Sequence, residues 1–501
     1  MVELQTPVQA AQWLREHVRG ELCTDSRRVR PGDGFIAWPG AATDGRQYMA
    51  QAFAQGASAC LMQREGAEAW QDLQPAERLA ALPGLKARTG WVADAYYEAP
   101  TRVLQVLAVT GTNGKTSSAC WLAQILAHPA IGQACGVVGT LGVGLWPELS
   151  HTGMTTPDPV LLQRSFRQMQ QAGAQWCAIE ASSIGIAEHR LEGTRIRTAV
   201  LTNFTQDHLD YHGSMAAYWA AKRQLFAWEG LQSAVVNIDD PQGAQLAAEL
   251  ADTGLDLWTC SRQRPARLRA WALPSREGLA FELVEGDARH RIDTRLTGDY
   301  NIDNLLGVIG ALRAQGLSLA QIATACADLR AVPGRMQRVV PSGVAVALPL
   351  AVVDYAHTPD ALNQALQALQ PLARERGGQL WCVVGCGGDR DPHKRPLMAA
   401  AAEKWAQRLV LTSDNPRSES PAAILAQMRQ GLAHAQAATV IEDRAQAIAH
   451  AVQQAGPADV LLVAGKGHET TQEIAGVFHP FSDVVQLEQA LAARAAQEVH
   501  A

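Results

Sequence analysis

The feature that most constrains the fold is a glycine loop between an apolar strand and an apolar helix. The pattern predicts a buried strand over residues 103–109 and a helix over residues 117–126, and the loop between them reads Thr110-Gly-Thr-Asn-Gly-Lys-Thr116-Ser117. Glycines let backbone N–H groups turn toward a phosphate, and a helix N-terminus adds positive potential. Lys115 supplies a point charge and the Thr116 hydroxyl can reach Mg²⁺. The loop therefore predicts an ATP or GTP site at the edge of an α/β sheet.

The loop departs from the general phosphate-loop pattern at one position. That pattern has a further glycine five residues before Gly114, where this chain has Val109. An accidental Gly-Lys-Thr in a helix-entry turn is the alternative reading, but the strand and helix on either side favour a variant nucleotide site.

Strands alternate with helices along most of the 501 residues, which predicts parallel sheets covered by helices. The exception is a run of strands without helices near residues 255–295, where antiparallel sheet is expected, followed by a helical stretch over 301–330. We predict an α/β protein of three domains. They are a small α/β N-terminal domain (1–97), a central domain with a P-loop-type ATPase sheet (98–332) and a C-terminal Rossmann-like domain (333–501).

Composition excludes several classes of protein. The formal net charge of -6 leaves no basic excess for nucleic-acid binding. No apolar run is long enough to span a membrane, and the first residues lack the pattern of a signal peptide. The nine cysteines are odd in number and scattered, which favours buried thiols in a reducing, cytoplasmic compartment over disulfides. Cys382 and Cys386 lack a second pair at zinc spacing.

Two polar residues follow strands that should end beside the glycine loop. Glu180 ends the predicted strand 176–180, and His208 follows the predicted strand 198–204. The carboxyl ends of parallel strands share one edge of a sheet, where α/β proteins bind ligands. Either residue alone reads as an ordinary loop carboxylate or a structural histidine. Together they predict a Mg²⁺ site.

Several separated motifs, in order along the whole chain, resemble the Mur ligase family. This family joins amino acids to the growing peptide of a cell-wall nucleotide precursor. Besides the glycine loop, the motifs are Glu180-Ala-Ser-Ser183, Asp207-His-Leu-Asp210, Tyr218-Trp-Ala-Ala-Lys222-Arg-Gln-Leu-Phe226, Asn301-Ile-Asp-Asn304, Pro333-Gly-Arg-Met336 and Asp354-Tyr-Ala-His357-Thr-Pro359.

The resemblance implies roles for residues that local patterns leave open. Lys222 alone reads as a solvated helix lysine, whereas in Mur ligases this lysine is carbamylated and can ligate Mg²⁺. The implied catalytic residues are Lys115, Lys222, Glu180 and His208, and the implied metal ligands are Thr116, Glu180, His208 and carbamylated Lys222. The implied ATP-binding residues are Gly111, Thr112, Asn113, Gly114, Lys115, Thr116, Ser117, Asn301, Arg335, Asp354 and His357.

Two further sets are implied for the other substrates. Asp414-Asn-Pro-Arg417 is typical of family members that use meso-diaminopimelate, which is lysine with one more carboxylate at its far end. A guanidinium fork suits that carboxylate, and Glu469 could hold the distal ammonium. The implied diaminopimelate residues are Arg390, Asp414, Asn415, Pro416, Arg417, Gly465 and Glu469. The implied UDP-substrate residues are Ser26, Arg27, Thr155, Thr156, Ser182, Glu188 and Arg190.

Two positions depart from the family pattern. Ile184 stands where the family usually has histidine, and Glu188 stands where it usually has glutamine. An isoleucine cannot form a hydrogen bond, and an additional carboxylate is expected to repel an anionic substrate.

The resemblance implies an ATP-dependent amide ligase, ADP-forming, that requires Mg²⁺. It would add meso-diaminopimelate to UDP-MurNAc-L-Ala-D-Glu through an acyl phosphate, in peptidoglycan synthesis and hence cell-wall growth, cell shape and division. A cytoplasmic monomer is expected. The alternatives are a lysine-adding or dipeptide-adding sister ligase, a folylpolyglutamate synthase, and a regulator that hydrolyses ATP as a switch. Arg417 and the N-terminal Asp25-Ser-Arg27 argue against the sister enzymes.

Overall fold

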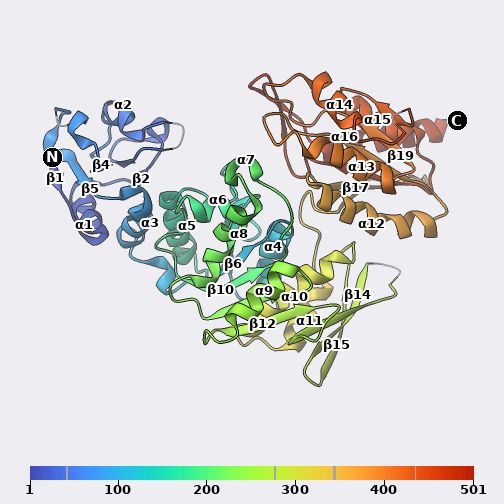
Figure 1. Cartoon of the computed structure of the whole chain (residues 1–501), viewed down its shortest axis with the longest axis horizontal. Helices are drawn as coiled ribbons and strands as arrows, with labels where there is room; N and C mark the ends of the chain where they lie inside the picture. The colour runs from blue at the N-terminus through green and yellow to red at the C-terminus, as the bar shows by residue number, and fades with distance from the viewer. Residues whose placement is uncertain (41–42, 71, 276–277, 342–345, 435, 501) are drawn as a thin grey trace.

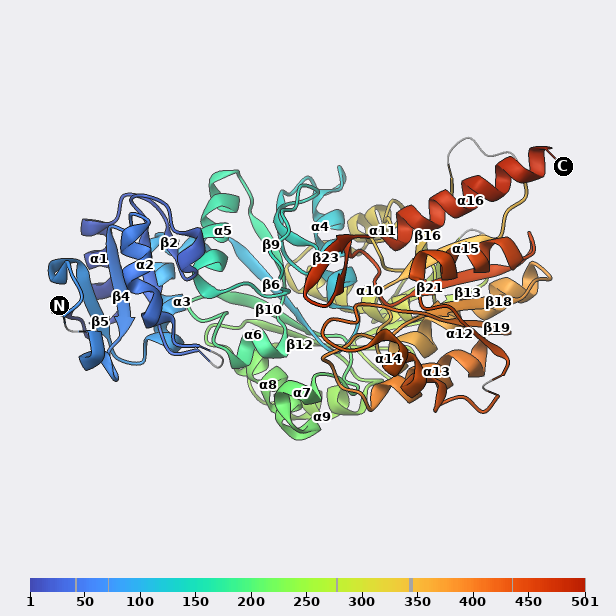
Figure 2. The same cartoon turned by 90° about the horizontal axis from the view of Figure 1, so that it is seen from above.

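Three α/β sheets follow one another along the chain in the computed structural model (Figure 1). The structure describes all residues except 41–42, 71, 276–277, 342–345, 435 and 501. The first sheet and the third lie at opposite ends of the molecule, with the second between them, and a view from above shows the three parts in a row (Figure 2). The α/β class with three domains is confirmed, and the limits at residues 97 and 332 stay predictions.

The N-terminal sheet has five parallel strands in the order β1-β5-β4-β3-β2. Short apolar strands such as β4 are buried on both faces, which is typical of parallel sheets. Its elements are β1 Val2–Glu3, α1 Pro7–His17, β2 Leu22–Cys23, β3 Gly34–Ala37, α2 Met49–Ala54, β4 Ala59–Gln63, β5 Leu79–Leu82 and α3 Leu85–Tyr96.

The central sheet has ten strands in the order β15-β14-β13-β12-β11-β10-β6-β9-β7-β8. Strands β6, β9, β10 and β11 are parallel, so their carboxyl ends meet at one edge. Helices α4 and α10 pack on one face and α5 and α9 on the other, which buries both faces. The strands are β6 Gln105–Thr110, β7 Cys135–Gly139, β8 Gly142–Leu145, β9 Trp176–Glu180, β10 Ile196–Leu201, β11 Ser233–Asn237, β12 Asp256–Ser261, β13 Leu268–Leu273, β14 Leu279–Glu285 and β15 Ala288–Thr294. The helices are α4 Lys115–Ala127, α5 Pro159–Gln171, α6 Ser183–Ala187, α7 Leu209–His212, α8 Met215–Arg223, α9 Pro241–Leu250, α10 Tyr300–Ala314 and α11 Leu319–Ala327.

The C-terminal sheet has six strands in the order β16-β17-β21-β18-β19-β20, all parallel except β16. A separate two-stranded hairpin, β22–β23, follows it in the chain. The strands are β16 Gln337–Val339, β17 Leu350–Asp354, β18 Leu380–Val384, β19 Arg408–Leu411, β20 Ala438–Val440, β21 Val460–Ala464, β22 Thr471–Ile474 and β23 Val477–Pro480. The helices are α12 Pro359–Glu375, α13 Lys394–Trp405, α14 Pro421–Arg429, α15 Arg444–Gln454 and α16 Asp483–His500.

Several predicted elements differ from the structure in detail. The helical stretch 301–330 is two helices, α10 and α11, because the chain turns at Gly316, whose φ is +86°. The antiparallel region begins only at β13, since β12 pairs in parallel with its neighbours. The helix expected over 117–126 begins earlier, at Lys115.

The predictions about membrane spans and cysteines can also be compared with the structure. No helix in the described part of the chain is long and apolar enough to cross a membrane. All nine cysteines are free, and eight of them are buried.

A buried ion pair joins α15 to the start of α16. Arg444 and Asp483 are both 0% exposed at their side chains, and two bonds of 2.7 Å link the guanidinium to the carboxylate. Arg444 also donates to the carbonyls of Ser413 and Ala464. Ser413 lies just after β19 and Ala464 ends β21, so each residue stands at the start of a loop. The pair therefore holds both loops against the helices.

We predict that Arg444→Met lowers the free energy of unfolding by about 3–5 kcal/mol, because it leaves the Asp483 carboxylate buried and unpaired. The double variant Arg444→Met/Asp483→Leu should recover most of that loss, since replacing a whole buried pair by apolar groups is often neutral. Denaturant midpoints for both variants test this. A double variant no more stable than Arg444→Met would contradict it.

Candidate active site

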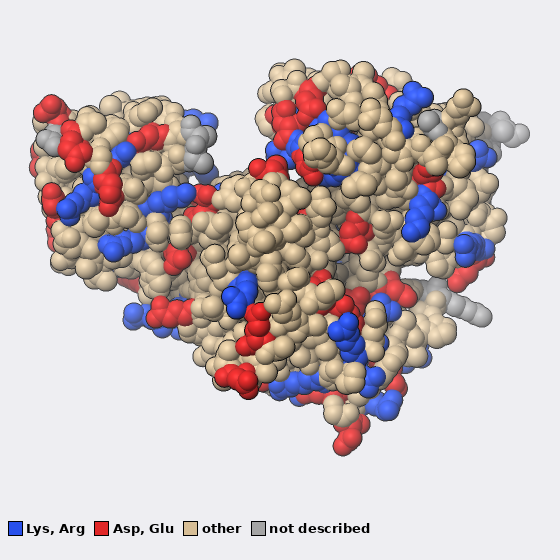
Figure 3. Space-filling model, in the orientation of Figure 1, with Lys and Arg blue, Asp and Glu red and all other residues tan. Residues whose placement is uncertain are grey.

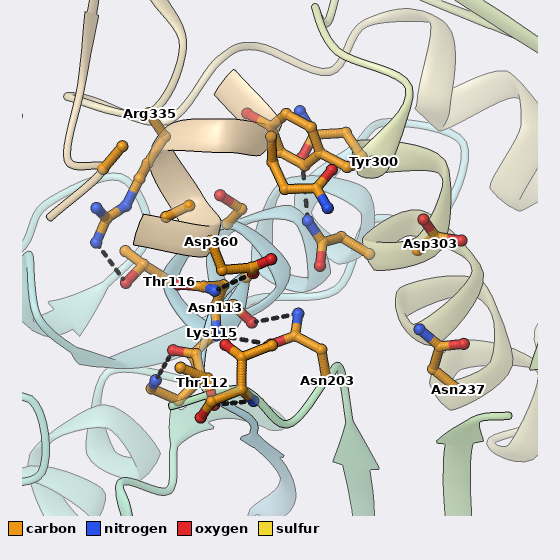
Figure 4. A pocket seen from close by; sticks show the side chains of 18 of the residues that line it. Thr112, Asn113, Lys115, Thr116, Asn203, Asn237, Tyr300, Asp303, Arg335 and Asp360 are labelled. Carbon is orange, nitrogen blue, oxygen red and sulfur yellow. Dashed lines mark hydrogen bonds between the residues drawn. The ribbon is translucent and has the colours of Figure 1, made fainter. Parts of the chain in front are cut away.

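A cavity of about 820 Å³ lies at the carboxyl edge of the central sheet, where loops of the C-terminal part close over it. Figure 3 shows a hollow above the central part, between the N-terminal and C-terminal parts. Figure 4 shows the cavity from close by, with side chains of both parts pointing into it. Among its lining residues are predicted ATP ligands: Thr112, Asn113, Gly114, Lys115, Thr116, Ser117, Asn301, Arg335, Asp354 and His357.

The phosphate loop turns sharply between β6 and α4. Gly114 precedes the helix with φ +86°, and a Cβ there would lie 2.2 Å from Asn304 Oδ1, so only glycine fits. Lys115 begins α4 and its Nζ donates to the carbonyls of Gly111 (2.9 Å) and Thr112 (2.8 Å). The ammonium thus lies against its own loop at a helix N-terminus, which is a site suited to phosphate.

A buried carboxylate lies beside this loop. Glu180, at the end of β9, is 1% exposed, and its Oε2 accepts a hydrogen bond of 2.9 Å from the Thr116 hydroxyl. Its Oε1 accepts from the backbone N–H of Thr140 at 2.7 Å. A Cβ on Gly139 would lie 2.2 Å from Oε1, so this strand must approach without a side chain. Thr116 and Glu180 present hard oxygen donors, the ligands that Mg²⁺ prefers, and Mg²⁺ needs only one or two carboxylates beside phosphate.

The other two predicted metal ligands, His208 and Lys222, come from other segments around the phosphate loop, and His208 lines the same cavity as Glu180. His208 is 40% exposed at its side chain and pairs with Asp207 at 3.5 Å. Over the described residues, no group of three or more His, Cys, Asp or Glu side chains is placed to hold a metal ion. Within the predicted set, Thr116 and Glu180 are joined by a direct hydrogen bond, and the full ligand set stays a prediction.

Lys222 is buried, contrary to what its helical pattern alone suggests. It is 1% exposed, and its Nζ donates to the Gly111 carbonyl at 2.7 Å. The same carbonyl accepts from Lys115, so two lysines share one oxygen. Burial and the nearby Lys115 charge hold the pKa of Lys222 well below its usual value.

The C-terminal part reaches the loop through two hydrogen bonds. Arg335 Nη2 donates to the Thr116 hydroxyl at 3.1 Å, and Asn113 Nδ2 donates to Asp360 Oδ2 at 3.2 Å. Arg335 also lies over the Tyr355 ring, 4.3 Å from its centroid. The cavity is therefore shared between two parts of the chain.

The remaining predicted ATP residues line the cavity in fixed orientations. Asn301 donates to the Thr297 carbonyl, and Asp354 accepts from the backbone N–H of Met336 at 2.7 Å. Burial lowers the pKa of His357 to about 4, so this imidazole is neutral at pH 7. Its Nδ1 lies 2.9 Å from the Tyr355 carbonyl.

Sequence reasoning missed several lining residues. Asn203 accepts from the Asn113 N–H at 2.9 Å; it lies in the predicted strand 198–204, after which only His208 was singled out. Trp271 and Tyr300 also line the cavity and carry no local signal of binding. Asp360 comes from a helix start in another part of the chain, a placement that no sequence spacing reveals.

The predicted UDP-substrate residues fall into two groups. Thr155, Thr156, Ser182 and Arg190 lie near Glu180: Thr156 donates to the Glu180 carbonyl at 2.7 Å, Thr155 contacts the Thr140 hydroxyl, and Arg190 donates to the Thr156 carbonyl. Thr155 and Ser182 line the cavity.

The second group lies in the N-terminal part and does not line the cavity. Ser26 donates to the Gln51 amide oxygen, and Arg27, which is exposed, pairs with Asp25.

Glu188, the departure from the family pattern, has partners of its own. Its carboxylate pairs with Lys86 of α3 at 2.7 Å and accepts from the Tyr211 hydroxyl at 2.5 Å. We expected the Glu188 carboxylate to repel the substrate. In the structure its negative charge is compensated by Lys86, and this ion pair links helix α3 to the central part. Ile184 is half-buried in α6.

The predicted diaminopimelate residues lie on three adjoining loops after β18, β19 and β21. Arg417 has φ +55°, donates to the Gly388 carbonyl at 2.7 Å and pairs with Glu473 at 3.3 Å. A Cβ on Gly387 would lie 2.9 Å from Arg417 Nη1 and 3.8 Å from Arg390 Cγ, so the two arginines flank one glycine.

Close backbone packing joins these loops. A Cβ on Gly388 would lie 1.9 Å from the Pro416 carbonyl oxygen, and one on Gly465 would lie 2.5 Å from Asp414 Oδ2. Asn415 Nδ2 donates to Glu469 Oε2 at 2.8 Å.

Family profiles match all three parts of the chain. "Mur ligase family, catalytic domain" matches residues 21–95, "Mur ligase middle domain" matches 109–312, and "Mur ligase, glutamate ligase domain" matches 334–467. A protein of Acidovorax sp. (strain JS42) named "UDP-N-acetylmuramoyl-L-alanyl-D-glutamate--2,6-diaminopimelate ligase" is 56% identical over 98% of both chains. The chain belongs to the Mur ligase family.

Further Mur ligases agree with this membership. A protein of the same name from Pseudomonas aeruginosa is 46% identical, covering 94% of this chain and 95% of its own. A solved structure of that name is 36% identical, covers 95% of both chains and has a TM-score of 0.63. MurF from Acinetobacter baumannii, 16% identical with a TM-score of 0.66, covers 97% of this chain and 98% of its own and shares the fold.

We predict that Gly114→Ala weakens ATP binding by about tenfold or more, because a left-handed backbone and a Cβ against Asn304 strain the loop by at least ~1–2 kcal/mol. Calorimetric titration with ATP measures it. Gly132→Ala is the matched control, because Gly132 also has a positive φ, +69°, but a Cβ there meets nothing within 4 Å. Equal affinities in the two variants would contradict the role of this close approach.

Proposed function

We propose that this Mur ligase adds meso-diaminopimelate to UDP-MurNAc-L-Ala-D-Glu with conversion of ATP to ADP and phosphate. The observation that carries the proposal is the 56% identity, over nearly the whole chain, to a protein named for that reaction. The chain's own Arg417, held beside Arg390, supports the same acceptor.

The chemistry follows from the poor reactivity of a free carboxylate. The D-glutamate γ-carboxylate attacks the γ-phosphorus of ATP, ADP leaves, and an acyl phosphate forms. The acceptor amine then attacks the acyl carbon, loses a proton and expels phosphate. Positioning and charge neutralisation supply most of the rate enhancement, and no protein nucleophile is needed.

The phosphate loop supplies the fixed positive charge for this step. Lys115 lies at the N-terminus of α4, where its ammonium and the helix dipole would face the transferring phosphoryl group. Arg335, bonded to Thr116, adds a second cation from the C-terminal part. Asn301, Asp354 and His357 line the same cavity and would contact the nucleotide.

Mg²⁺ fits the oxygen pair of Thr116 and Glu180, which would hold it with nucleotide oxygens as further ligands. When bound, it neutralises phosphate charge. His208 and carbamylated Lys222 complete the proposed set.

Carbamylation of Lys222 fits its surroundings. Its amine shares the Gly111 carbonyl with Lys115 in a buried site, an arrangement that places two cations together. Addition of CO₂ to the amine releases a proton and makes an anion there. The buried carbamate would pair with Lys115 and face the metal site.

The acceptor site is proposed on the three C-terminal loops. The guanidinium of Arg417 would pair with the distal carboxylate of diaminopimelate, with Arg390 beside it, and Asp414, Asn415, Pro416 and Gly465 shape the pocket. The UDP-substrate would lie along Thr155, Thr156, Ser182 and Arg190, with its uridine end toward Ser26 and Arg27. The nine free cysteines suit the reducing cytoplasm, where this precursor is made.

Rival functions differ in what drives ATP turnover. A lysine-adding or dipeptide-adding ligase, or a folylpolyglutamate synthase such as the Mycobacterium tuberculosis enzyme that shares the fold at 18% identity and a TM-score of 0.60, would require another acceptor. A nucleotide switch would require none.

We predict that phosphate is released only when ATP, UDP-MurNAc-L-Ala-D-Glu and meso-diaminopimelate are all present. Coupled phosphate release and the mass of the product, measured with single amino acids, test this. Equal release without an amino acid would favour the switch.

For Lys222, mass spectrometry of the native protein under bicarbonate should show one added carbamate. Lys222→Ala should be nearly inactive, because the ligand set loses its anion, and short carboxylic acids should partly restore turnover by filling the gap. Lys404→Ala, an exposed lysine of α13, is the control. Full activity of Lys222→Ala would refute the role.

Arg417→Ala should raise the KM for meso-diaminopimelate by about a hundredfold and scarcely change weak activity with lysine, because only diaminopimelate has the distal carboxylate. Arg429→Ala, on the exposed surface of α14, should change neither value. An Arg417→Ala enzyme that keeps the wild-type preference between the two acceptors would show that another residue sets specificity.

A further inference from the structure

Lys466 is a fully buried lysine beside the proposed acceptor site. Its side chain is 0% exposed, and its Nζ donates to Asn415 Oδ1 at 2.8 Å and to Glu469 Oε2 at 2.7 Å. Lysines are almost never fully buried unless they are paired. Both partners belong to the proposed diaminopimelate site, whereas Lys466 has no assigned role.

The backbone on either side of Lys466 turns its side chain inward. Gly465 has φ +117° and Gly467 has φ +54°, a conformation that favours glycine. A Cβ on Gly467 would lie 2.7 Å from Tyr355 Cβ. The Gly-Lys-Gly turn thus packs closely on both sides and directs the ammonium to the 414–417 loop, not to a phosphate.

The contacts of Lys466 fix the orientation of the Glu469 carboxylate. Glu469 Oε2 accepts from both Lys466 Nζ and Asn415 Nδ2, while Oε1 has no partner within the described residues. The Glu469 side chain is 28% exposed. Asn415 Oδ1 accepts from Lys466 and from the Glu473 N–H at 3.1 Å, which sets the direction of the amide. One carboxylate oxygen is therefore held and the other is free for a ligand.

We propose that Lys466 is a positioning residue for the acceptor amino acid, which holds Glu469 so that its free Oε1 meets the distal ammonium of diaminopimelate. This inference rests on the proposed function. In this proposal two sets of residues bind the distal end of the substrate. Arg417 pairs with the distal carboxylate, and Glu469, held by Lys466, pairs with the distal ammonium. A fixed carboxylate loses less conformational freedom on binding than a free one.

Because separate residues bind the distal carboxylate and the distal ammonium, substrate analogues can distinguish a positioning role of Lys466 from a merely structural one. Lysine has the distal ammonium without the carboxylate, and L-2-aminopimelate has the carboxylate without the ammonium. A loop that is simply loosened would bind both compounds less well. A misplaced Glu469 would weaken lysine and diaminopimelate but not 2-aminopimelate.

The test compares wild type, Lys466→Met and Lys466→Gln as full-length enzymes. Methionine fills the buried volume without charge, and glutamine keeps a hydrogen-bond donor group without charge. Two variants are used so that the test does not depend on one of them folding, and thermal unfolding shows whether each is folded. For each we would measure the KM for ATP, the nucleotide substrate and meso-diaminopimelate, and the inhibition constants of L-lysine and L-2-aminopimelate against diaminopimelate. Lys404→Met is the matched control, an exposed lysine of the same domain.

In Lys466→Met we expect the KM for diaminopimelate and the inhibition constant of lysine to rise by about tenfold, as for loss of an oriented charged hydrogen bond. The constant for 2-aminopimelate and the other two KM values should stay within about twofold, a change too small for loss of such a bond. Glutamine should give an intermediate effect. In a Glu469→Gln background, Lys466→Met should add no further loss of affinity.

An unchanged KM for diaminopimelate in either folded variant would overturn the inference, and so would an equal loss of affinity for lysine and 2-aminopimelate. Failure of the proposed function is distinguishable, because wild type would then show no turnover dependent on diaminopimelate.

Discussion

The Glu180 carboxylate is the point at which the central part of the chain comes together. It accepts hydrogen bonds from the first turn of α4 and from the backbone after β7, while its own carbonyl accepts from Thr156. A carboxylate with this burial is stable only when its oxygens are satisfied. The parallel order of β6, β9 and β7 brings these groups to one sheet edge. The phosphate loop, the proposed metal site and the neighbouring threonines thus depend on one buried acid.

The C-terminal part completes the site through contacts that cross between domains. Arg335 bonds to Thr116 and Asp360 bonds to Asn113, so the nucleotide cavity exists only where the two parts meet. The proposed acceptor loops follow strands of the C-terminal sheet, and Arg444, paired with Asp483, donates to the backbone at the start of two of them. In the proposed function, the central sheet edge holds the phosphates and the C-terminal sheet edge presents the amine.

Much of this organisation could be predicted from sequence, and the physical reasons are clear. The glycine loop and buried strands such as β9 and β21 have strong local patterns, and the α/β class and family are confirmed. The short strands β7, β8, β22 and β23 were not predicted. Strands β7 and β8 are short and rich in glycine, and β22 and β23 form a largely exposed hairpin, so neither pair has a clear apolar periodicity. Local patterns also could not predict the burial of Lys222 or the hydrogen bond between Asn113 and Asp360, since both depend on tertiary packing between distant segments. Glu188 shows the same limit: its departure from the family suggested repulsion, and its compensation by Lys86 is visible only in three dimensions.

The central claim is that the substrate carboxylate is activated by phosphorylation at this site. The most direct test uses UDP-MurNAc-L-Ala-D-Glu with a heavy oxygen isotope in the γ-carboxylate of its D-glutamate. After reaction with ATP and meso-diaminopimelate, mass spectrometry of the released inorganic phosphate reports where that oxygen went. The account predicts that each phosphate carries one oxygen from the carboxylate, because the acyl–oxygen bond breaks when the amine attacks. Phosphate that contains no label while the amide product accumulates would contradict it.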